Sequence, residues 1–120
     1  VYFSRYAMAV YEREEDILKI SPNYEALKYL KYNGIIVTAK GNNCDFVSRF
    51  FAPKFGIMED PVTGSAHCEL IPHWSKMLNK KEMIARQLSH RGGELYCSYK
   101  GKRVTIAGKA ITYMRGELLL

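Results

Sequence analysis

Short apolar runs separated by polar stretches mark the first half of the chain, and three of these runs predict strands. Residues 3–10 form the first run. Residues 34–39 form a continuous run rich in β-branched side chains, which is typical of a strand buried on both faces. Residues 45–51 predict a third strand, with Phe46, Ser48 and Phe50 on one face and Val47, Arg49 and Phe51 on the other.

A helix is expected between the first two strands. Ser21-Pro22 is a typical helix start, because serine caps free N–H groups and proline suits the first helical position. Asn33-Gly34 is a typical helix end. The acidic residues at 12–16 are expected to form an exposed turn before this helix.

The hydrophobic period changes near residue 64, and a longer helix is expected from Ser65 to Leu78. Its apolar residues recur at helical spacing, and Ala66 and Cys68 add apolar surface, so the helix should be buried over much of its circumference. Pro72 predicts a kink or a break near residues 68–71.

The last third of the chain predicts a short helix from Lys81 to Leu88 and then three strands. Lys100-Gly101 is expected to be the tight turn of a hairpin. The strands are expected at residues 94–99, 103–107 and 110–114. The order β-α-β-β-α-α-β-β-β, without repeat or linker, predicts a single α+β domain.

Composition agrees with a folded domain. The chain has 120 residues, of which 48% are hydrophobic and 25% charged, and this excludes disordered, collagen-like and disulfide-dense proteins. No apolar run approaches the roughly 20 residues of a membrane-spanning helix, and no signal peptide is visible. The chain is strand-like from Val1 onward, so we expect a processed chain or a piece of a longer one.

The formal net charge is +6, and the whole excess lies in residues 61–120, which hold ten Lys and Arg against four Asp and Glu. Neither zinc-finger spacing nor an aromatic RNA-binding motif accompanies the basic residues. A solvated basic surface is therefore expected, with attraction of small anionic substrates and binding of a polyanion as the alternatives.

Cys44, Cys68 and Cys97 lie far apart and form no Cys-x-x-Cys pair, so neither a zinc site nor a disulfide framework is predicted. Free buried thiols in a reducing cytoplasm are the expectation. Together with His67 and His90, the cysteines match no known metal template, and no metal is expected.

Residues 59–67 carry the candidate chemistry, because they lead from a loop into the apolar helix. Gly64 lets a ligand approach the backbone closely. The free N–H groups of Gly64, Ser65 and Ala66, at the positive end of a helix, favour an anion, and the hydroxyl of Thr63 or Ser65 adds a hydrogen bond. A carboxylate is the expected guest, because no phosphate loop of the Gly-Lys-Ser type is present.

Asp60 is the candidate for acid–base assistance, and a structural alternative stays open. In that alternative, Thr63 or Ser65 only caps the helix and Asp60 only complements its dipole. Ser65 is not an esterase-type nucleophile, because His67 replaces the second glycine of Gly-x-Ser-x-Gly. Helix positions i and i+2 point apart, so Ser65 and His67 are not a dyad. Proton transfer needs an acid and a base on defined faces of the substrate, and no second partner is evident.

Four motifs follow one another in order along the chain. They are Arg49-Phe50-Phe51-Ala52-Pro53, Gly56-Ile57-x-Glu59-Asp60-Pro61-Val62-Thr63-Gly64-Ser65-Ala66-His67, Pro72-x-Trp74-Ser75 and Gln87-x-Ser89-x-Arg91-Gly92-Gly93-Glu94-Leu95. Together they resemble the C-terminal half of the phenazine-biosynthesis PhzF-like family, which includes a mammalian phenazine biosynthesis-like domain member. The resemblance runs essentially from end to end.

The resemblance implies one lobe of a fold like that of diaminopimelate epimerase, a curled and mostly antiparallel sheet around a central apolar helix that begins at Ser65. It implies isomerisation or epimerisation of a small carboxylate by proton transfer, without a cofactor, in a cleft between two lobes. By this resemblance, Asp60 and Ser65 are the catalytic residues. By the same resemblance, the backbone of Gly64, Ser65 and Ala66 holds the substrate carboxylate, to which the residues themselves add Thr63 as a candidate hydroxyl donor.

The family's principal acid–base glutamate and its partner histidine belong to the N-terminal lobe, near Gly-Asn-Pro and Gly-His motifs that this chain lacks. The resemblance thus implies that the N-terminal lobe of the same protein is a partner and that the chain alone has little or no activity. An uncovered interlobe face would favour a homodimer. A non-catalytic protein-interaction module is the alternative function, and neither specific nucleic-acid binding nor membrane binding is expected.

Overall fold

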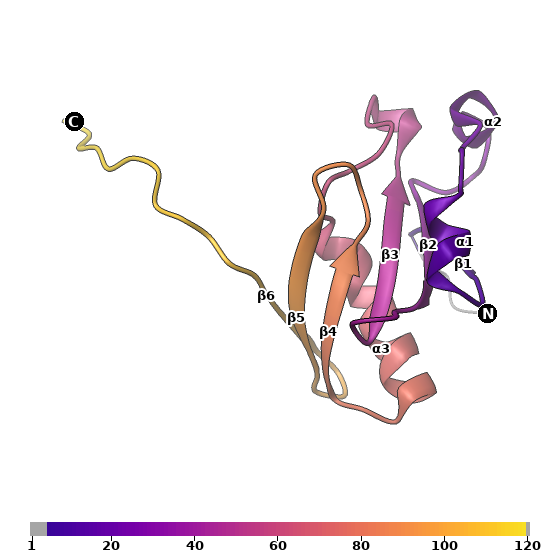
Figure 1. Ribbon diagram of the computed structural model, residues 1–120. Coiled ribbons are helices and arrows are strands. Elements are labelled where there is room, and N and C mark those ends of the chain that lie inside the picture. The colour runs from indigo at the N-terminus through magenta and orange to yellow at the C-terminus, as the bar shows by residue number, and fades with distance from the viewer. Residues whose placement is uncertain (1–4, 120) are drawn as a thin grey trace.

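One helix of 15 residues, α3 (Gly64–Leu78), lies against a six-stranded sheet within residues 5–119, which are those that the computed structural model describes (Figure 1). The shorter helices α1 (Glu14–Leu18) and α2 (Tyr24–Lys28) cover the other face, and a 3-10 turn, η1 (Pro53–Phe55), follows the third strand. The strands are β1 (Ala7–Val10), β2 (Ile35–Lys40), β3 (Phe46–Phe51), β4 (Glu82–Gln87), β5 (Gly93–Tyr99) and β6 (Val104–Ala107).

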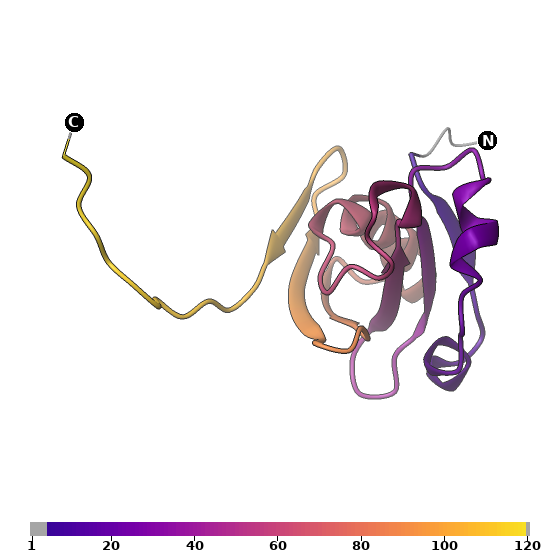
Figure 2. The same cartoon turned by 90° about the horizontal axis from the view of Figure 1, so that it is seen from above.

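The strands lie side by side in chain order. The β1–β2 and β3–β4 pairs are parallel, and the other three neighbouring pairs are antiparallel. A parallel pair needs a crossover connection, which α3 provides between β3 and β4. The sheet is open and curls around α3 (Figure 2). These features confirm the expected α+β fold with a mostly antiparallel sheet around a central helix.

Each face of the sheet has its own apolar core. On the α3 side, Phe46 and Phe50 of β3 pack in one cluster with Trp74. On the side of α1 and α2, Val47 and Phe51 pack in the second cluster. Alternate residues of β3 therefore serve opposite cores, as the period of a strand requires. The β-branched run of β2 is buried on both faces, as predicted.

Pro72 does not interrupt α3, so the expected break near residues 68–71 is wrong. A proline in a helix interior removes one hydrogen bond and costs about 3 kcal/mol. Leu70, Ile71 and Trp74 are all buried on the same stretch of the helix. Burying each of these side chains contributes about 2 kcal/mol, which outweighs the cost of the proline.

The predicted helix from Lys81 to Leu88 is wrong, because residues 82–87 form strand β4. Met83, Ala85 and Gln87 are buried and the residues between them are exposed, which is the period of a strand. β4 pairs with β3 on one side and β5 on the other. Both partner strands come from other segments of the chain, so the pattern within residues 81–88 does not show that this segment pairs with them.

Three of the acidic residues expected in a turn, Glu14, Glu15 and Asp16, instead form the first turn of helix α1, whereas Glu12 lies in an exposed bend before it. Ile17 is fully buried in the core beneath α1, so the segment has an apolar anchor. Acidic side chains in the first turn also suit the positive end of a helix.

Helix α2 is much shorter than the helix expected between Ser21 and Gly34. It is capped by Asn23, whose side chain accepts a hydrogen bond of 3.0 Å from the backbone N–H of Ala26. The helix ends at Lys28, and the residues that follow form a turn.

At both ends of the sheet, the described residues contain less strand than expected. β1 begins at Ala7, and residues 3 and 4 of the predicted strand lie outside the described residues. The hairpin turn at Lys100-Gly101 is confirmed, with φ of 73° at Gly101. No strand forms at 110–114, because residues 108–119 leave the body as an extended, exposed tail (Figure 1).

All three cysteines are free thiols. Cys97 is buried, Cys44 is half-buried and Cys68 is exposed, so the expectation of buried thiols is wrong for Cys68. Burial raises the pKa of the Cys97 thiol to about 12. Within residues 5–119, no three His, Cys, Asp or Glu side chains gather where they could hold a metal, and no helix is long and apolar enough to cross a membrane.

Candidate functional site

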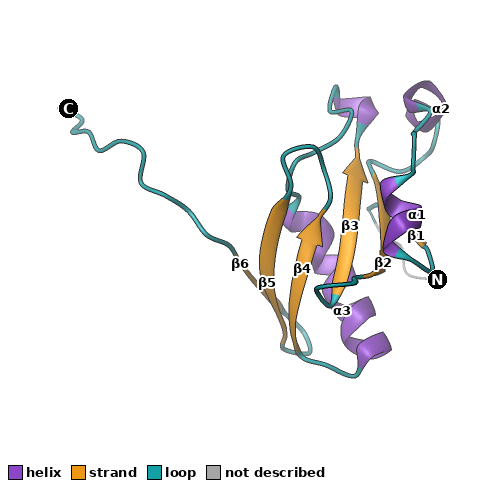
Figure 3. Ribbon diagram, viewed as in Figure 1, coloured by secondary structure: helices purple, strands orange, loops and turns teal. Residues whose placement is uncertain are grey.

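A loop leads from the end of β3 to the start of α3 and carries the predicted site (Figure 3). The backbone N–H of Asp60 donates to the carbonyl of Phe50 at 3.0 Å, which ties the loop to β3. Val62 packs against Gly93 of β5, where a Cβ atom would lie only 2.3 Å from Val62 Cγ2. Glycine at position 93 therefore lets the loop approach the sheet closely.

Thr63 occupies the N-cap position of α3, but its side chain does not cap the helix. Its hydroxyl instead donates to Asp60 Oδ2 at 2.5 Å. This contact orients the Asp60 carboxylate, and the expected contact from the Thr63 hydroxyl to a bound carboxylate stays a prediction. The Thr63 side chain is therefore not a cap, and that part of the structural alternative is wrong.

The first two residues of α3 face outward, whereas Ala66 is buried at 2% exposure. Gly64 and Ser65 are exposed, and the space where a side chain at position 64 would point holds no atom within 4 Å. The N–H groups of the first turn have no acceptor inside the helix and lie at the positive end of its dipole. Gly64 and Ser65 can therefore offer exposed N–H donors to an anion, beside the Asp60 carboxylate, and the predicted contact from the buried Ala66 stays a prediction.

Tyr6 adds a phenol to this site that sequence reasoning missed. Its hydroxyl lies 2.9 Å from Ser65 Oγ, and either oxygen can donate. The ring of Tyr6 packs edge-on against Phe50, with 5.0 Å between ring centroids. The two hydroxyls come from residues 59 positions apart, so no local motif could have brought them together.

His67 points away from this site and into the core. It is fully buried, its Nδ1 lies 2.8 Å from the carbonyl oxygen of Thr63, and its ring packs beside Phe46. Burial lowers the pKa of His67, which keeps the imidazole neutral at pH 7. Ser65 faces outward, so the two side chains do not form a dyad, as predicted.

Glu59 is already paired and does not share the site with Asp60. Arg49 donates to both of its carboxylate oxygens, at 2.7 and 2.9 Å. The same guanidinium donates to the carbonyls of Ile17 and Ile20. The pair thus joins the β3–α3 loop to the end of α1 and the residues after it, and Asp60 is the carboxylate next to the start of α3.

Gln87, at the end of β4, is a second residue that sequence reasoning did not place in the site. Its side-chain amide contacts three atoms of the Asp60–Thr63 turn: Oε1 accepts from Thr63 N at 2.8 Å, and Nε2 lies 2.7 Å from Asp60 O and 3.1 Å from Thr63 Oγ1. Ser89 Oγ donates to the carbonyl of Pro61 at 2.8 Å. The side chains of Gln87, the last residue of β4, and Ser89, two residues later, therefore hold the turn.

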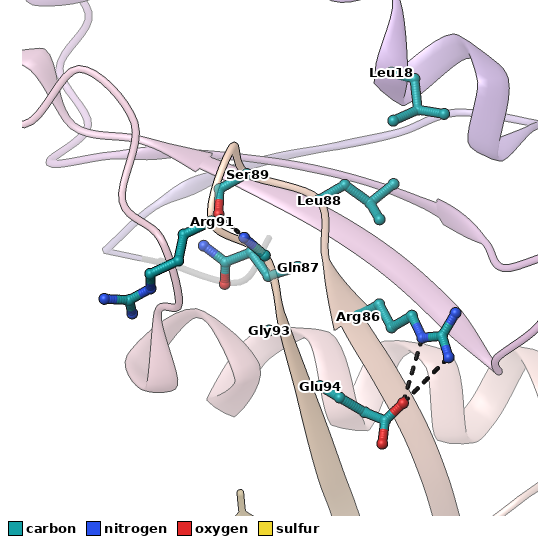
Figure 4. Close-up of a pocket in the computed structure, with 9 residues that line it drawn as sticks. Leu18, Arg86, Gln87, Leu88, Ser89, Arg91, Gly93 and Glu94 are labelled. Carbon is teal, nitrogen blue, oxygen red and sulfur yellow. Dashed lines mark hydrogen bonds and ion pairs between the residues drawn. The ribbon is translucent and has the colours of Figure 1, made fainter. Parts of the chain in front are cut away.

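A shallow hollow of about 450 Å³ opens beside Gln87 but does not include Asp60 or the first turn of α3 (Figure 4). Arg86 and Arg91 supply positive charge to it, and Glu94 pairs with Arg86 at 3.3 Å. The Glu94 carboxylate thus neutralises part of the positive charge that lines the hollow. The hollow is separate from the predicted carboxylate site.

Residues 4–116 match the family model described as "Phenazine biosynthesis-like protein". An uncharacterized isomerase of Pseudomonas aeruginosa is 51% identical over 113 residues, which are 94% of this chain and 43% of that protein. The human phenazine biosynthesis-like domain-containing protein is 50% identical over 95 residues, which are 73% of this chain and 33% of that protein.

Solved structures give the same result. The crystal structure of an Enterococcus faecalis PhzF-family phenazine biosynthesis protein superposes with a TM-score of 0.90 at 49% identity, over 99% of this chain and 46% of that one. A Clostridium difficile PhzC/PhzF protein gives 0.88 at 45% identity, over 98% and 46%. The chain therefore spans less than half the length of these relatives. The sequence match and the shared fold together establish that the chain belongs to the PhzF-like family of phenazine biosynthesis-like proteins.

Proposed function

We propose that this chain is the C-terminal lobe of a two-lobed isomerase and that the start of α3 binds the carboxylate of a small substrate. One observation carries the proposal: α3 begins without a side-chain cap, with the Asp60 carboxylate held beside its first turn by Thr63. Gly64, Ser65 and Ala66 would supply N–H donors, and the Ser65 hydroxyl would add another. A helix N-terminus is suited to an anion in both hydrogen bonding and dipole.

Asp60 would serve as one of the two groups that a proton shift requires. An isomerisation removes a proton from one carbon and returns it to another, so a base and an acid must lie on defined sides of the substrate. Asp60 can accept or return a proton at its carboxylate, next to the bound carboxylate of the substrate. The second group would come from the part of the family fold that this chain does not span.

Carboxylate binding can be measured on the 120-residue chain itself. In a titration with benzoate followed by ¹H–¹⁵N NMR, the amide signals of Gly64, Ser65 and Ala66 should shift most. Ser65→Ala should weaken benzoate about fivefold, because it removes one hydrogen bond of roughly 1 kcal/mol. Ser21→Ala, in the exposed segment before α2, is the matched control and should bind as the wild type does.

Benzamide provides the chemical control, because it has the same ring and no charge. It should leave the amides at the start of α3 unshifted at the concentrations where benzoate shifts them. Equal responses to benzoate and benzamide, or shifts located away from residues 63–66, would contradict the proposed carboxylate site.

We further propose that the remaining half of the family fold covers an apolar surface of this chain and that the isolated chain pairs with a second copy instead. Ile111, Tyr113 and Met114 in the tail are at least 80% exposed, and Phe55 and Ile57 on the β3–α3 loop are also exposed. Water-exposed apolar surface of this kind favours association.

Sedimentation velocity tests this pairing. The chain should sediment as a species heavier than the monomer, in proportions that rise with protein concentration. The double substitution Ile111→Ser with Tyr113→Ser should shift it toward the monomer, whereas Tyr29→Ser with Leu30→Ser, on exposed residues at and after the end of α2, should not. A wild-type chain that stays monomeric at every concentration would rule the pairing out.

A further inference from the structure

We propose that Gln87 is a positioning residue for the carboxylate site and that it sets the direction in which the Thr63 hydroxyl donates. This inference rests on the proposed function of Asp60 and the α3 start. Gln87 lies on another element, 24 and 27 residues away from Thr63 and Asp60. It contacts neither the outward face of the first turn nor the Asp60 carboxylate.

Both polar atoms of the Gln87 side-chain amide have hydrogen-bond partners. The amide oxygen accepts from the N–H of Thr63, the residue just before α3. The amide nitrogen has two donors, and two acceptors lie within reach: the Asp60 carbonyl oxygen and the Thr63 hydroxyl oxygen. One planar group therefore holds both ends of the Asp60–Thr63 turn at fixed separation.

The direction of these bonds determines where the Thr63 proton points. Because the Gln87 amide nitrogen can only donate, Thr63 Oγ1 must accept from it. The single proton of the Thr63 hydroxyl is then free to donate to Asp60 Oδ2, at 2.5 Å. The Asp60 carboxylate is thus oriented through Thr63 by a residue that does not touch it.

Core packing gives no reason for an amide at this position. Met83 and Ala85 precede Gln87 on the same buried side of β4, and the Gln87 side chain is 1% exposed. Burying a polar group is unfavourable unless it is hydrogen-bonded, and an apolar residue would fill the space without that requirement. The partners that Gln87 satisfies all belong to the candidate site.

Two substitutions separate the acceptor from the donors. Gln87→Met keeps the length and removes every hydrogen bond. Gln87→Glu keeps an acceptor for Thr63 N but replaces the donating nitrogen with an oxygen, so the Thr63 hydroxyl is drawn away from Asp60. Ser98→Ala is the matched control, because Ser98 is also buried and its hydroxyl bonds to Glu82 at the opposite end of β4.

The test combines two measurements on the 120-residue chain, with circular dichroism to verify folding. Without ligand, hydrogen exchange at the Thr63 amide should accelerate at least about tenfold in Gln87→Met and stay unchanged in Ser98→Ala. With benzoate, both Gln87 variants should bind at least about fivefold more weakly than the wild type. The Gln87→Glu defect should shrink as the pH falls from about 7 to about 5, because burial at this position raises the pKa of the carboxyl and its protonated form regains a donor.

The outcomes distinguish this inference from the proposed function. Benzoate binding that is equal in the wild type and in folded Gln87 variants overturns the positioning role, as does an equal loss in Ser98→Ala. If the wild type binds no benzoate, the proposed carboxylate function fails, and the exchange rate at Thr63 then decides whether Gln87 holds the turn. If Gln87→Met does not fold, Gln87→Glu and its pH dependence decide the result.

Discussion

Asp60→Asn should lower the rate of proton exchange about a hundredfold or more in a two-lobed protein that carries this chain. Asparagine has nearly the same shape and still offers an oxygen to the Thr63 hydroxyl, which donates to Asp60 Oδ2 here. It cannot take up and return a proton, so the loss reports proton transfer and not packing. The 120-residue chain alone should give no measurable exchange, because the proposed function places the second acid–base group in the part of the family fold that this chain does not span.

A chimera makes this prediction measurable. This chain would replace the matching 113-residue segment of the Pseudomonas aeruginosa isomerase, to which it is 51% identical. The chimera would be incubated in D₂O with the carboxylic acids of a small-molecule cell extract, and mass spectrometry would detect deuterium uptake. Asp16→Asn is the control, because Asp16 pairs with Arg13 in an exposed ion pair away from the site. Equal exchange by the Asp60 and Asp16 variants would exclude the proposed role of Asp60.

Trp74→Ala should lower the free energy of unfolding by about 3–5 kcal/mol, the largest stability effect that we expect. Trp74 is 4% exposed on α3 and stacks on Phe46, with 5.9 Å between ring centroids. Its indole N–H donates to Thr38 Oγ1 at 2.9 Å, which joins α3 to β2. The truncation leaves a cavity and removes that hydrogen bond at the same time.

Urea unfolding followed by far-UV circular dichroism gives the measurement, because the signal does not depend on the tryptophan. Met77→Ala, three residues later on the same helix and 64% exposed, should change stability by no more than about 0.5 kcal/mol. Trp74→Phe should fall between the two, because it keeps most of the buried ring and loses the hydrogen bond. A Trp74→Ala variant as stable as Met77→Ala would show that α3 is not the centre of the core.

The part of the candidate site that lies in one continuous segment could be predicted from the sequence. Asp60, Thr63 and the first turn of α3 lie within seven residues, so a loop followed by an apolar helix places them together whatever surrounds them. Tyr6 and Gln87 were not predictable in the same way. Tyr6 lies just before β1 and Gln87 lies at the end of β4, so each reaches the site from a distant part of the chain. In the sequence, neither residue differs from the mixed apolar and polar residues around it.

The errors in secondary structure have a similar origin. Apolar and polar residues alternate only weakly from Lys81 to Leu88. The segment forms a strand because β3 and β5 pair with it on either side. The residues at 110–114 are rich in β-branched and aromatic side chains, yet no neighbouring strand pairs with them within the described residues. Strands depend on partners that lie elsewhere in the chain, whereas a long helix makes its own hydrogen bonds.

The sequence by itself determined the α+β class, the central helix and the run of residues that begins it, because helical periodicity and a local helix start are encoded within single segments. Only the tertiary structure decided how that helix start is used. The sheet places the end of β4 against the Asp60–Thr63 turn. There the Gln87 side chain accepts from the Thr63 N–H and donates to the Thr63 hydroxyl oxygen, and the Thr63 hydroxyl donates to Asp60. The physical reason is that a hydrogen bond needs its two atoms within about 3 Å, and residues so far apart in the chain meet at that distance only when the sheet is formed.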